Sequence, residues 1–163
     1  MKHIIQPISN LFHPLLSITW AALLMLFYTP LCVVPVGFRM GVLFEGMFMT
    51  FLLPSVIIIL MSKIGIVKNG VALRDRADRV IPLCVQMVLY ICLAVLLKIQ
   101  GMPSWALYVF YGASALAVVY SIVTIWWKIS AHAGCNAALA TVALISYYEF
   151  PNIMPLILPL FLI

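Results

Sequence analysis

Long apolar segments alternate with short polar ones along most of this chain. Five of them are long enough for a membrane helix, at residues 15–36, 40–61, 80–97, 105–127 and from 130–133 to about 148. Roughly 20 apolar residues in a helix cross the hydrocarbon core of a bilayer, where a helix satisfies its own backbone hydrogen bonds. The pattern therefore predicts an all-α protein, a polytopic membrane helical bundle that forms a single integral membrane domain over residues 1–163.

A last apolar run covers residues 153–163 and contains Pro155 and Pro159. It is too short to cross a bilayer, so it is either a short terminal segment or part of a sixth helix that is cut because the chain is a fragment, and we favour the fragment. The predicted architecture is five full transmembrane helices plus a partial sixth.

Proline and glycine indicate where these helices bend or end. Pro30 and Pro35 should kink the second half of the first helix, and Pro54 should interrupt the second. Proline has these effects because it lacks a backbone N–H donor and its ring clashes with the preceding turn. We expect a tight turn at residues 37–39, between the first helix and the second.

The composition supports the same class of protein. Hydrophobic residues make up 66% of the chain and charged residues 8%, and the mean hydropathy is +1.22, whereas soluble domains carry about 25% charged residues. We therefore expect a multi-pass protein of the cell membrane, which is the inner membrane if the cell is Gram-negative. The basic residues flank the apolar segments and form no basic and aromatic platform, so nothing indicates binding to nucleic acid.

The four cysteines all lie in or beside apolar segments. They are Cys32, Cys84, Cys92 and Cys135. Free cysteine behaves as a small buried hydrophobe, and no pair of them has the spacing of metal ligands. We predict no metal site and no cofactor.

Charge gathers in two polar islands. The first island, residues 63–79, contains five lysines and arginines; the second, residues 126–134, carries Lys128, Ser130 and His132 at alternate positions between two apolar segments. If the helices cross the membrane alternately, both islands lie on one face together with the N-terminus. Arginine and lysine bind phosphate at close range, and basic pockets between helices bind lipid head groups. The predicted partner is therefore a membrane lipid that carries phosphate, and the oligomeric state is left open.

The same distribution of charge predicts the orientation. Most basic residues lie on the face of the two islands, and the opposite face has only Arg39 and Lys98. Because loops on the cytoplasmic side carry an excess of lysine and arginine, we expect the N-terminus to be cytoplasmic.

Two stretches resemble the signatures of a known family. Ile129-Ser130-Ala131-His132, with Lys128 before it, resembles the Pro-Ser-Gly-His signature of the type 2 phosphatidic acid phosphatase superfamily, in a form similar to that of small bacterial membrane members. The stretch from Asp75 to Pro82 resembles the first signature region, in which a lysine is followed at a distance by Arg-Pro. The resemblance covers about residues 68–163.

This resemblance implies a hydrolase that removes phosphate from a lipid phosphate or pyrophosphate through a phosphohistidine, without metal. Lys68 and Arg79 would hold the phosphate, and Ser130 would hydrogen-bond it. Lys128, in the second island, is a further predicted phosphate ligand. His132 would be the general acid that protonates the leaving lipid alcohol.

The third signature of the family, an arginine followed by the nucleophilic histidine, is absent from these 163 residues. The other histidines, His3 and His13, lie at the opposite end of the chain. Without a nucleophile the phosphohistidine cannot form, so whether the chain is an enzyme stays open.

Two other functions remain open. A non-catalytic membrane bundle that binds lipid or a partner protein would use the cations to set topology, with Ser130 as a helix N-cap. An intramembrane prenyltransferase would use Asp75 and Asp78, which lie three residues apart on one helix face, to hold magnesium and a diphosphate.

Overall fold

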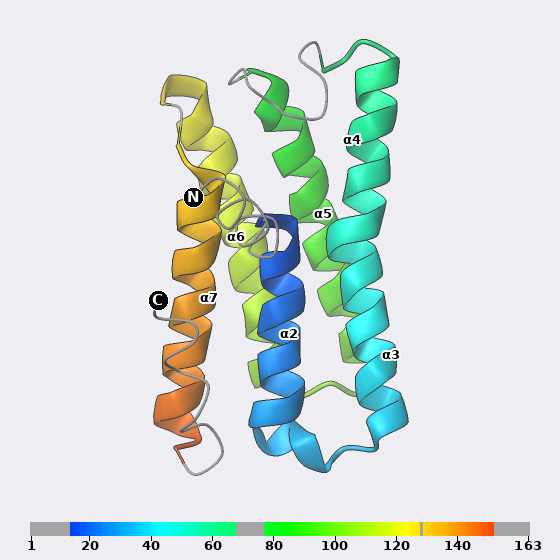
Figure 1. The fold of residues 1–163 in the computed structure, drawn as a ribbon, viewed down its shortest axis with the longest axis vertical. Helices are drawn as coiled ribbons and strands as arrows, with labels where there is room; N and C mark the ends of the chain where they lie inside the picture. The colour runs from blue at the N-terminus through cyan, green and yellow to red at the C-terminus, as the bar shows by residue number, and fades with distance from the viewer. Residues whose placement is uncertain (1–13, 68–76, 128, 152–163) are drawn as a thin grey trace, which may run out of the picture. The chain divides into compact units, whose positions relative to one another are not determined.

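The computed structural model describes residues 14–67, 77–127 and 129–151, which are mostly helical and contain no strand. The elements in chain order are the 3-10 segment Pro14–Leu16, α2 (Ser17–Tyr28), the 3-10 segment Pro30–Val33, α3 (Val36–Met47), the π-helical segment Phe48–Leu52, α4 (Leu53–Lys63), α5 (Ala77–Ile99), α6 (Ser104–Trp126) and α7 (Ala131–Glu149) (Figure 1). The all-α prediction is confirmed for this part of the chain.

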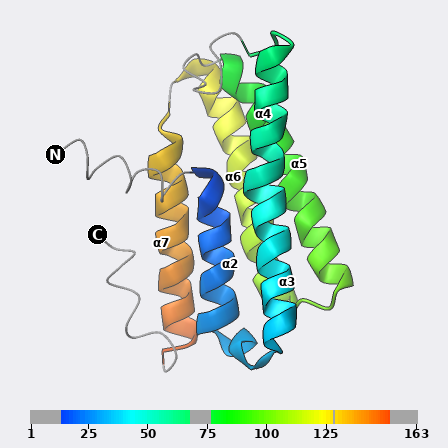
Figure 2. The same ribbon diagram turned by 45° about the vertical axis from the view of Figure 1, so that its right-hand side comes forward.

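Contacts between residues divide the chain into two compact units. The first unit comprises residues 1–46 and 131–163, and the second comprises residues 47–130. The boundary between residues 46 and 47 lies within one continuous helical run, Val36–Lys63, which contains α3, the π-helical segment and α4 (Figure 2). A single membrane domain over the whole chain stays a prediction.

Three helical stretches among the described residues are long and apolar enough to cross a membrane. They are Val36–Lys63, Asp78–Ile99 and Ser104–Trp126. Each exposes large apolar side chains, for example Phe44, Val88 and Ile122, as expected for a helix surface that faces lipid. These stretches correspond to the second, third and fourth predicted spans, and the three long apolar helices agree with insertion into a membrane.

The first predicted helix, residues 15–36, is wrong in its extent. α2 ends at Tyr28, and Thr29 adopts an extended conformation with φ −129° and ψ 179°. Pro30 favours this break, because the helical region is disfavoured for the residue before a proline. The expected kink is therefore a break, and α2 has 12 residues.

The predicted turn at residues 37–39 is also wrong, since these residues form the first turn of α3. The amide of Arg39 donates to the carbonyl of Pro35 at 3.2 Å, so the helix begins directly after the proline. Proline fits this position because the first residues of a helix have no intrahelical partner for their N–H groups.

Pro54 changes the local backbone hydrogen-bond pattern without ending the helix. In an α-helix the amide of residue 54 would donate to the carbonyl of Thr50, and proline has no such donor. The backbone before Pro54 instead forms the π-helical segment Phe48–Leu52. In this segment the amide of Leu53 donates to the carbonyl of Phe48. The side chain of Gln86 on α5 donates to the Thr50 carbonyl at 3.3 Å.

Within the second unit, α5 and α6 pack along their length as an antiparallel pair (Figure 1). α5 ends in a Schellman motif, in which Gly101 has φ 86°. The amide of Gly101 donates to the carbonyl of Lys98 at 3.1 Å, and the amide of Met102 donates to the carbonyl of Leu97 at 3.0 Å. Glycine adopts positive φ without the steric penalty that a Cβ would bring. The turn that follows brings α6 back against α5.

The hydroxyl of Ser114 on α6 joins the two helices by donating to the carbonyl of Met87 at 3.3 Å. Ser114 is buried, as are Phe110 and Ala117 on the same side of α6. This spacing of three and four residues is that of one helix face, so α6 turns a continuous buried face inward.

Within the first unit, α7 packs against α2 (Figures 1 and 2). Ser17 at the start of α2 makes a hydrogen bond with the side chain of Cys135. The buried residues of α7 recur at helical spacing and are Leu139, Ala143 and Ser146. The small side chains of Ala143 and Ser146 permit close helix contact.

Candidate functional site

The two polar islands touch through Arg79. This residue lies in the first turn of α5 and is half-buried. Its Nη1 donates a hydrogen bond of 3.1 Å to the backbone carbonyl of Ile129, which follows α6. Fifty residues separate the two partners in sequence, so this bond depends on the antiparallel packing of α5 and α6. It joins the two stretches that the sequence placed on one membrane face.

Tyr120 makes a hydrogen bond with Ser130, the next residue of the second island. Its hydroxyl on α6 donates to the backbone carbonyl of Ser130 at 3.4 Å. Two consecutive carbonyls, those of Ile129 and Ser130, therefore accept hydrogen bonds from two different helices. Sequence reasoning missed Tyr120. The available signal was a tyrosine less than two turns from the end of a membrane helix, where its polar tip can reach the interface.

Ser130 is exposed and immediately precedes α7, which begins at Ala131. His132 is exposed in the first turn of α7. Ser130 belongs to the second unit and His132 to the first. The described geometry thus connects Arg79 with Ile129 and Tyr120 with Ser130. For His132 it gives the position in the helix and the exposure of the side chain.

Two of the predicted phosphate ligands, Lys68 and Lys128, lie outside the described residues. The same holds for Asp75, one of the two aspartates considered for magnesium. Its partner Asp78 is buried in the first turn of α5, where a carboxylate interacts favourably with the positive end of the helix dipole. Within the described ranges no group of three or more histidine, cysteine or acidic side chains could hold a metal ion.

Electrostatics gives a reason for the contact of Arg79 with the second island. A cation in the first turn of a helix opposes the helix dipole, so the start of α5 is an unfavourable place for arginine. A bond to a carbonyl just beyond the C-terminal end of α6 offsets that effect, because a charged donor makes a stronger hydrogen bond than a neutral one. A guanidinium carries five N–H donors, and the Ile129 carbonyl accepts from one of them, on Nη1.

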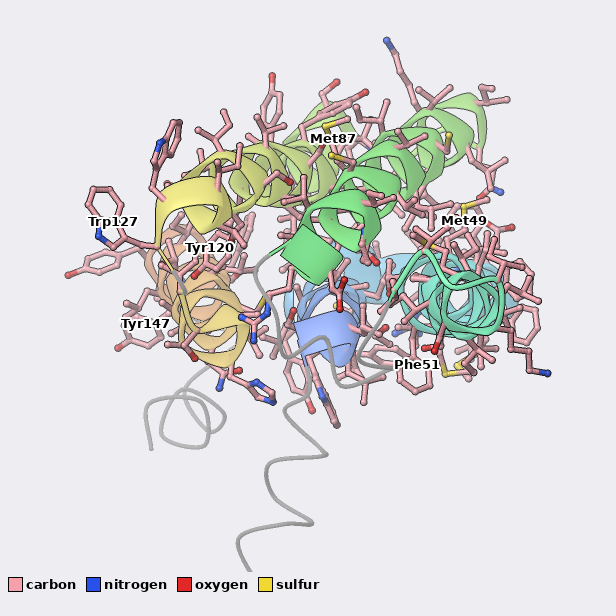
Figure 3. All side chains as sticks on the ribbon, turned by 90° about the horizontal axis from the view of Figure 1, so that it is seen from above. Met49, Phe51, Met87, Tyr120, Trp127 and Tyr147 are labelled. Carbon is pink, nitrogen blue, oxygen red and sulfur yellow. The ribbon has the colours of Figure 1, made fainter. Side chains whose placement is uncertain are left out.

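Exposed aromatic side chains lie at this end of α6, as is typical of a membrane interface. Trp126 and Trp127 are both exposed, and Trp127 projects outward from the end of the helix in the view from above (Figure 3). Tryptophan is enriched where the hydrocarbon core meets the head groups. Ile129 and Ser130 follow these two tryptophans shortly after the end of α6.

Comparisons with protein-family models, curated proteins and solved structures found no match for this chain. The resemblance to the phosphatase signatures therefore rests on the residues quoted from the sequence.

Proposed function

We propose that this protein is a multi-pass membrane protein that binds the phosphate group of a membrane lipid where its two polar islands meet. The observation that carries the proposal is the 3.1 Å hydrogen bond from Arg79 to the carbonyl of Ile129. It brings a charged donor beside Ser130, whose side chain is exposed. Arginine and serine are both common donors to phosphate oxygens.

The surroundings favour a lipid over a soluble phosphate compound. The ends of two membrane-length helices, Asp78–Ile99 and Ser104–Trp126, converge at this position, and exposed tryptophans flank it. A lipid can place its phosphate here while its acyl chains lie along the exposed apolar surface of these helices. Lys68 and Lys128 belong to the same two islands, and we include them in the proposed site.

The proposed topology has five full spans and a cytoplasmic N-terminus. Three spans are supported by the length and apolar character of the described helices. In this proposal α2 with the segment after it, and α7, provide the other two crossings. The phosphate site then lies on the cytoplasmic face of a bacterial cell membrane, the face that carries most of the basic residues.

Lipid binding can be tested with the full chain in nanodiscs. The affinity for phosphatidic acid is compared with that for diacylglycerol, which lacks the phosphate. Arg79→Gln should weaken binding of phosphatidic acid by about tenfold, because hydrogen bonds to charged groups contribute about 1.5–3 kcal/mol. Lys98→Gln is the matched control, since it removes one cation from the other end of α5, where Lys98 is exposed. Equal affinity for the two lipids, or equal losses in the two variants, would refute the proposal.

Hydrolysis of the bound phosphate is the second candidate function. The pattern Ser130-x-His132 next to Arg79 favours it, by resemblance to the phosphatase signatures. The test is release of inorganic phosphate from phosphatidic acid without added magnesium, with Ser130→Ala and His132→Asn as variants. Release that both variants abolish would support hydrolysis. Binding without release would leave a lipid-binding bundle as the function.

A further inference from the structure

A second cation lies outside this site, at the corner between α2 and α3 in the first unit. Arg39 is half-buried in the first turn of α3. The central carbon of its guanidinium lies 4.7 Å from the centroid of the Phe27 ring, a cation–π contact. Its Nε is buried and, among the described residues, has no hydrogen-bond partner.

Hydrogen bonds hold the corner in one conformation. The hydroxyl of Thr29 donates to the carbonyl of Met25 and accepts from the amide of Leu31 at 3.3 Å. The carbonyl of Thr29 accepts from the amide of Cys32 at 2.9 Å. Because these bonds link the end of α2 to the segment that leads into α3, the Phe27 ring and the Arg39 guanidinium are positioned before any ligand arrives.

The surface around Arg39 is apolar and exposed. Val33, Val36 and Met40 all expose large parts of their side chains. Arg39 also stands at the start of the membrane-length run Val36–Lys63, which places its guanidinium at the depth of lipid head groups. An arginine flanked by lipid-facing side chains at this depth meets phosphate oxygens as its nearest acceptors.

The nearest acidic residue along α3 is not placed to pair with Arg39. Glu45 follows Arg39 by six residues, about one and two-thirds turns of helix, and so points from a different side of α3. A buried N–H group without an acceptor is unfavourable by about 1–3 kcal/mol, and more when the group is charged. The Nε atom is itself buried and out of reach of a ligand, so an anion would offset the charge through the accessible part of the half-buried Arg39 side chain.

We propose that Arg39, held against Phe27, is a binding site for the phosphate of an anionic lipid. The site is formed by residues of the first unit alone, and it is independent of the function proposed for the two polar islands. The chemistry it recognises is a phosphate monoester or diester anion, and the apolar rim selects the lipid form over free phosphate.

The experiment uses the full chain with Arg79→Gln as the background, so that the first site does not contribute. Binding of phosphatidylglycerol is measured by native mass spectrometry from nanodiscs of phosphatidylcholine with a minor fraction of phosphatidylglycerol. Adding Arg39→Gln should weaken binding by about tenfold, because a charge-assisted hydrogen bond is lost. Adding Lys98→Gln, an exposed cation on the same predicted face, should leave the affinity unchanged. Equal losses in the two variants would show a general effect of surface charge and overturn the proposal, as would no loss with Arg39→Gln.

Two further variants keep the test valid if Arg39→Gln fails to fold. Arg39→Lys retains the positive charge but lacks the Nε and the planar fork, and should bind several-fold more weakly than arginine. Phe27→Leu retains Arg39 but loses the aromatic platform, and should also weaken binding. Full affinity in both variants would refute the site. Inorganic phosphate is the competing probe, and its displacement of phosphatidylglycerol at equal concentration would assign the site to free phosphate and overturn the lipid assignment.

Discussion

The side-chain amide of Gln86 donates a hydrogen bond of 3.3 Å to the backbone carbonyl of Thr50. Both residues are buried, and the bond joins α5 to the π-helical segment. The amide that an α-helix would offer to this carbonyl is missing because residue 54 is proline. The buried side chain of Gln86 thus has a structural role, because it donates to a carbonyl that can receive no hydrogen bond from Pro54.

Gln86→Leu should lower the free energy of unfolding by about 0.5–2 kcal/mol, the range for hydrogen bonds between membrane helices. The loss arises because the buried carbonyl of Thr50 keeps no side-chain donor from α5. Unfolding in mixed micelles with increasing denaturing detergent provides the measurement. Gln100→Leu, at an exposed position after the same helix, is the control and should change stability less. Equal stability of the Gln86→Leu variant and the wild type would contradict the interpretation.

Pro54→Ala should reduce the effect of Gln86→Leu. Alanine supplies an amide at residue 54, which can donate to the Thr50 carbonyl in the α-helical pattern. A double-mutant cycle measures the coupling between the two positions. The loss of unfolding free energy caused by Gln86→Leu should at least halve in the Pro54→Ala background, and an undiminished loss would show that the two positions act separately.

Ser114→Leu should destabilise the pair of α5 and α6 by about 1–3 kcal/mol, the usual effect of inserting volume into a packed contact. Ser114 is buried and bonded to the Met87 carbonyl. Ala115 is the neighbouring exposed position, and Ala115→Leu should leave the free energy of unfolding nearly unchanged because the added side chain faces lipid. The comparison fails if both variants lose the same stability.

Tyr120→Phe should loosen the second polar island without unfolding the protein. The variant removes the hydroxyl that bonds the Ser130 carbonyl and keeps the aromatic ring. Hydrogen exchange at residues 129–131 should become faster, while the free energy of unfolding changes by less than about 1 kcal/mol. Tyr111→Phe, at an exposed position on the same helix, should leave this exchange unchanged. Unchanged exchange in Tyr120→Phe would mean that the hydrogen bond does not restrain the segment.

Labelling with a membrane-impermeant maleimide tests the proposed topology. In a variant without native cysteines, Lys63→Cys and Gln100→Cys are introduced one at a time, because both positions are exposed and α5 lies between them. Gln100→Cys should be labelled in intact spheroplasts, and Lys63→Cys after permeabilisation. The opposite result would reverse the orientation, and equal labelling of both in intact spheroplasts would contradict the crossing by α5.

The helices α5 and α6 were predictable because their signals are local. A long apolar run gives the span, and Gly101 with Pro103 after it gives the end of α5. The break before Pro30 was read as a kink, although the proline rule that excludes Thr29 from the helix is also local. The π-helical segment was harder to predict from the sequence, because the sequence shows Pro54 but not which backbone conformation the preceding turn adopts.

The sequence by itself determined the class of protein, three of its membrane-length helices and the two polar islands, since apolar length and charge act within one segment. Only the tertiary structure decided that Arg79 bonds Ile129, that Tyr120 bonds Ser130 and that Gln86 bonds Thr50. Each of the two contacts made from α5 joins residues more than thirty positions apart, and the tyrosine contact depends on how the chain turns back after α6. Such bonds follow from the register in which whole helices pack, which no local pattern specifies.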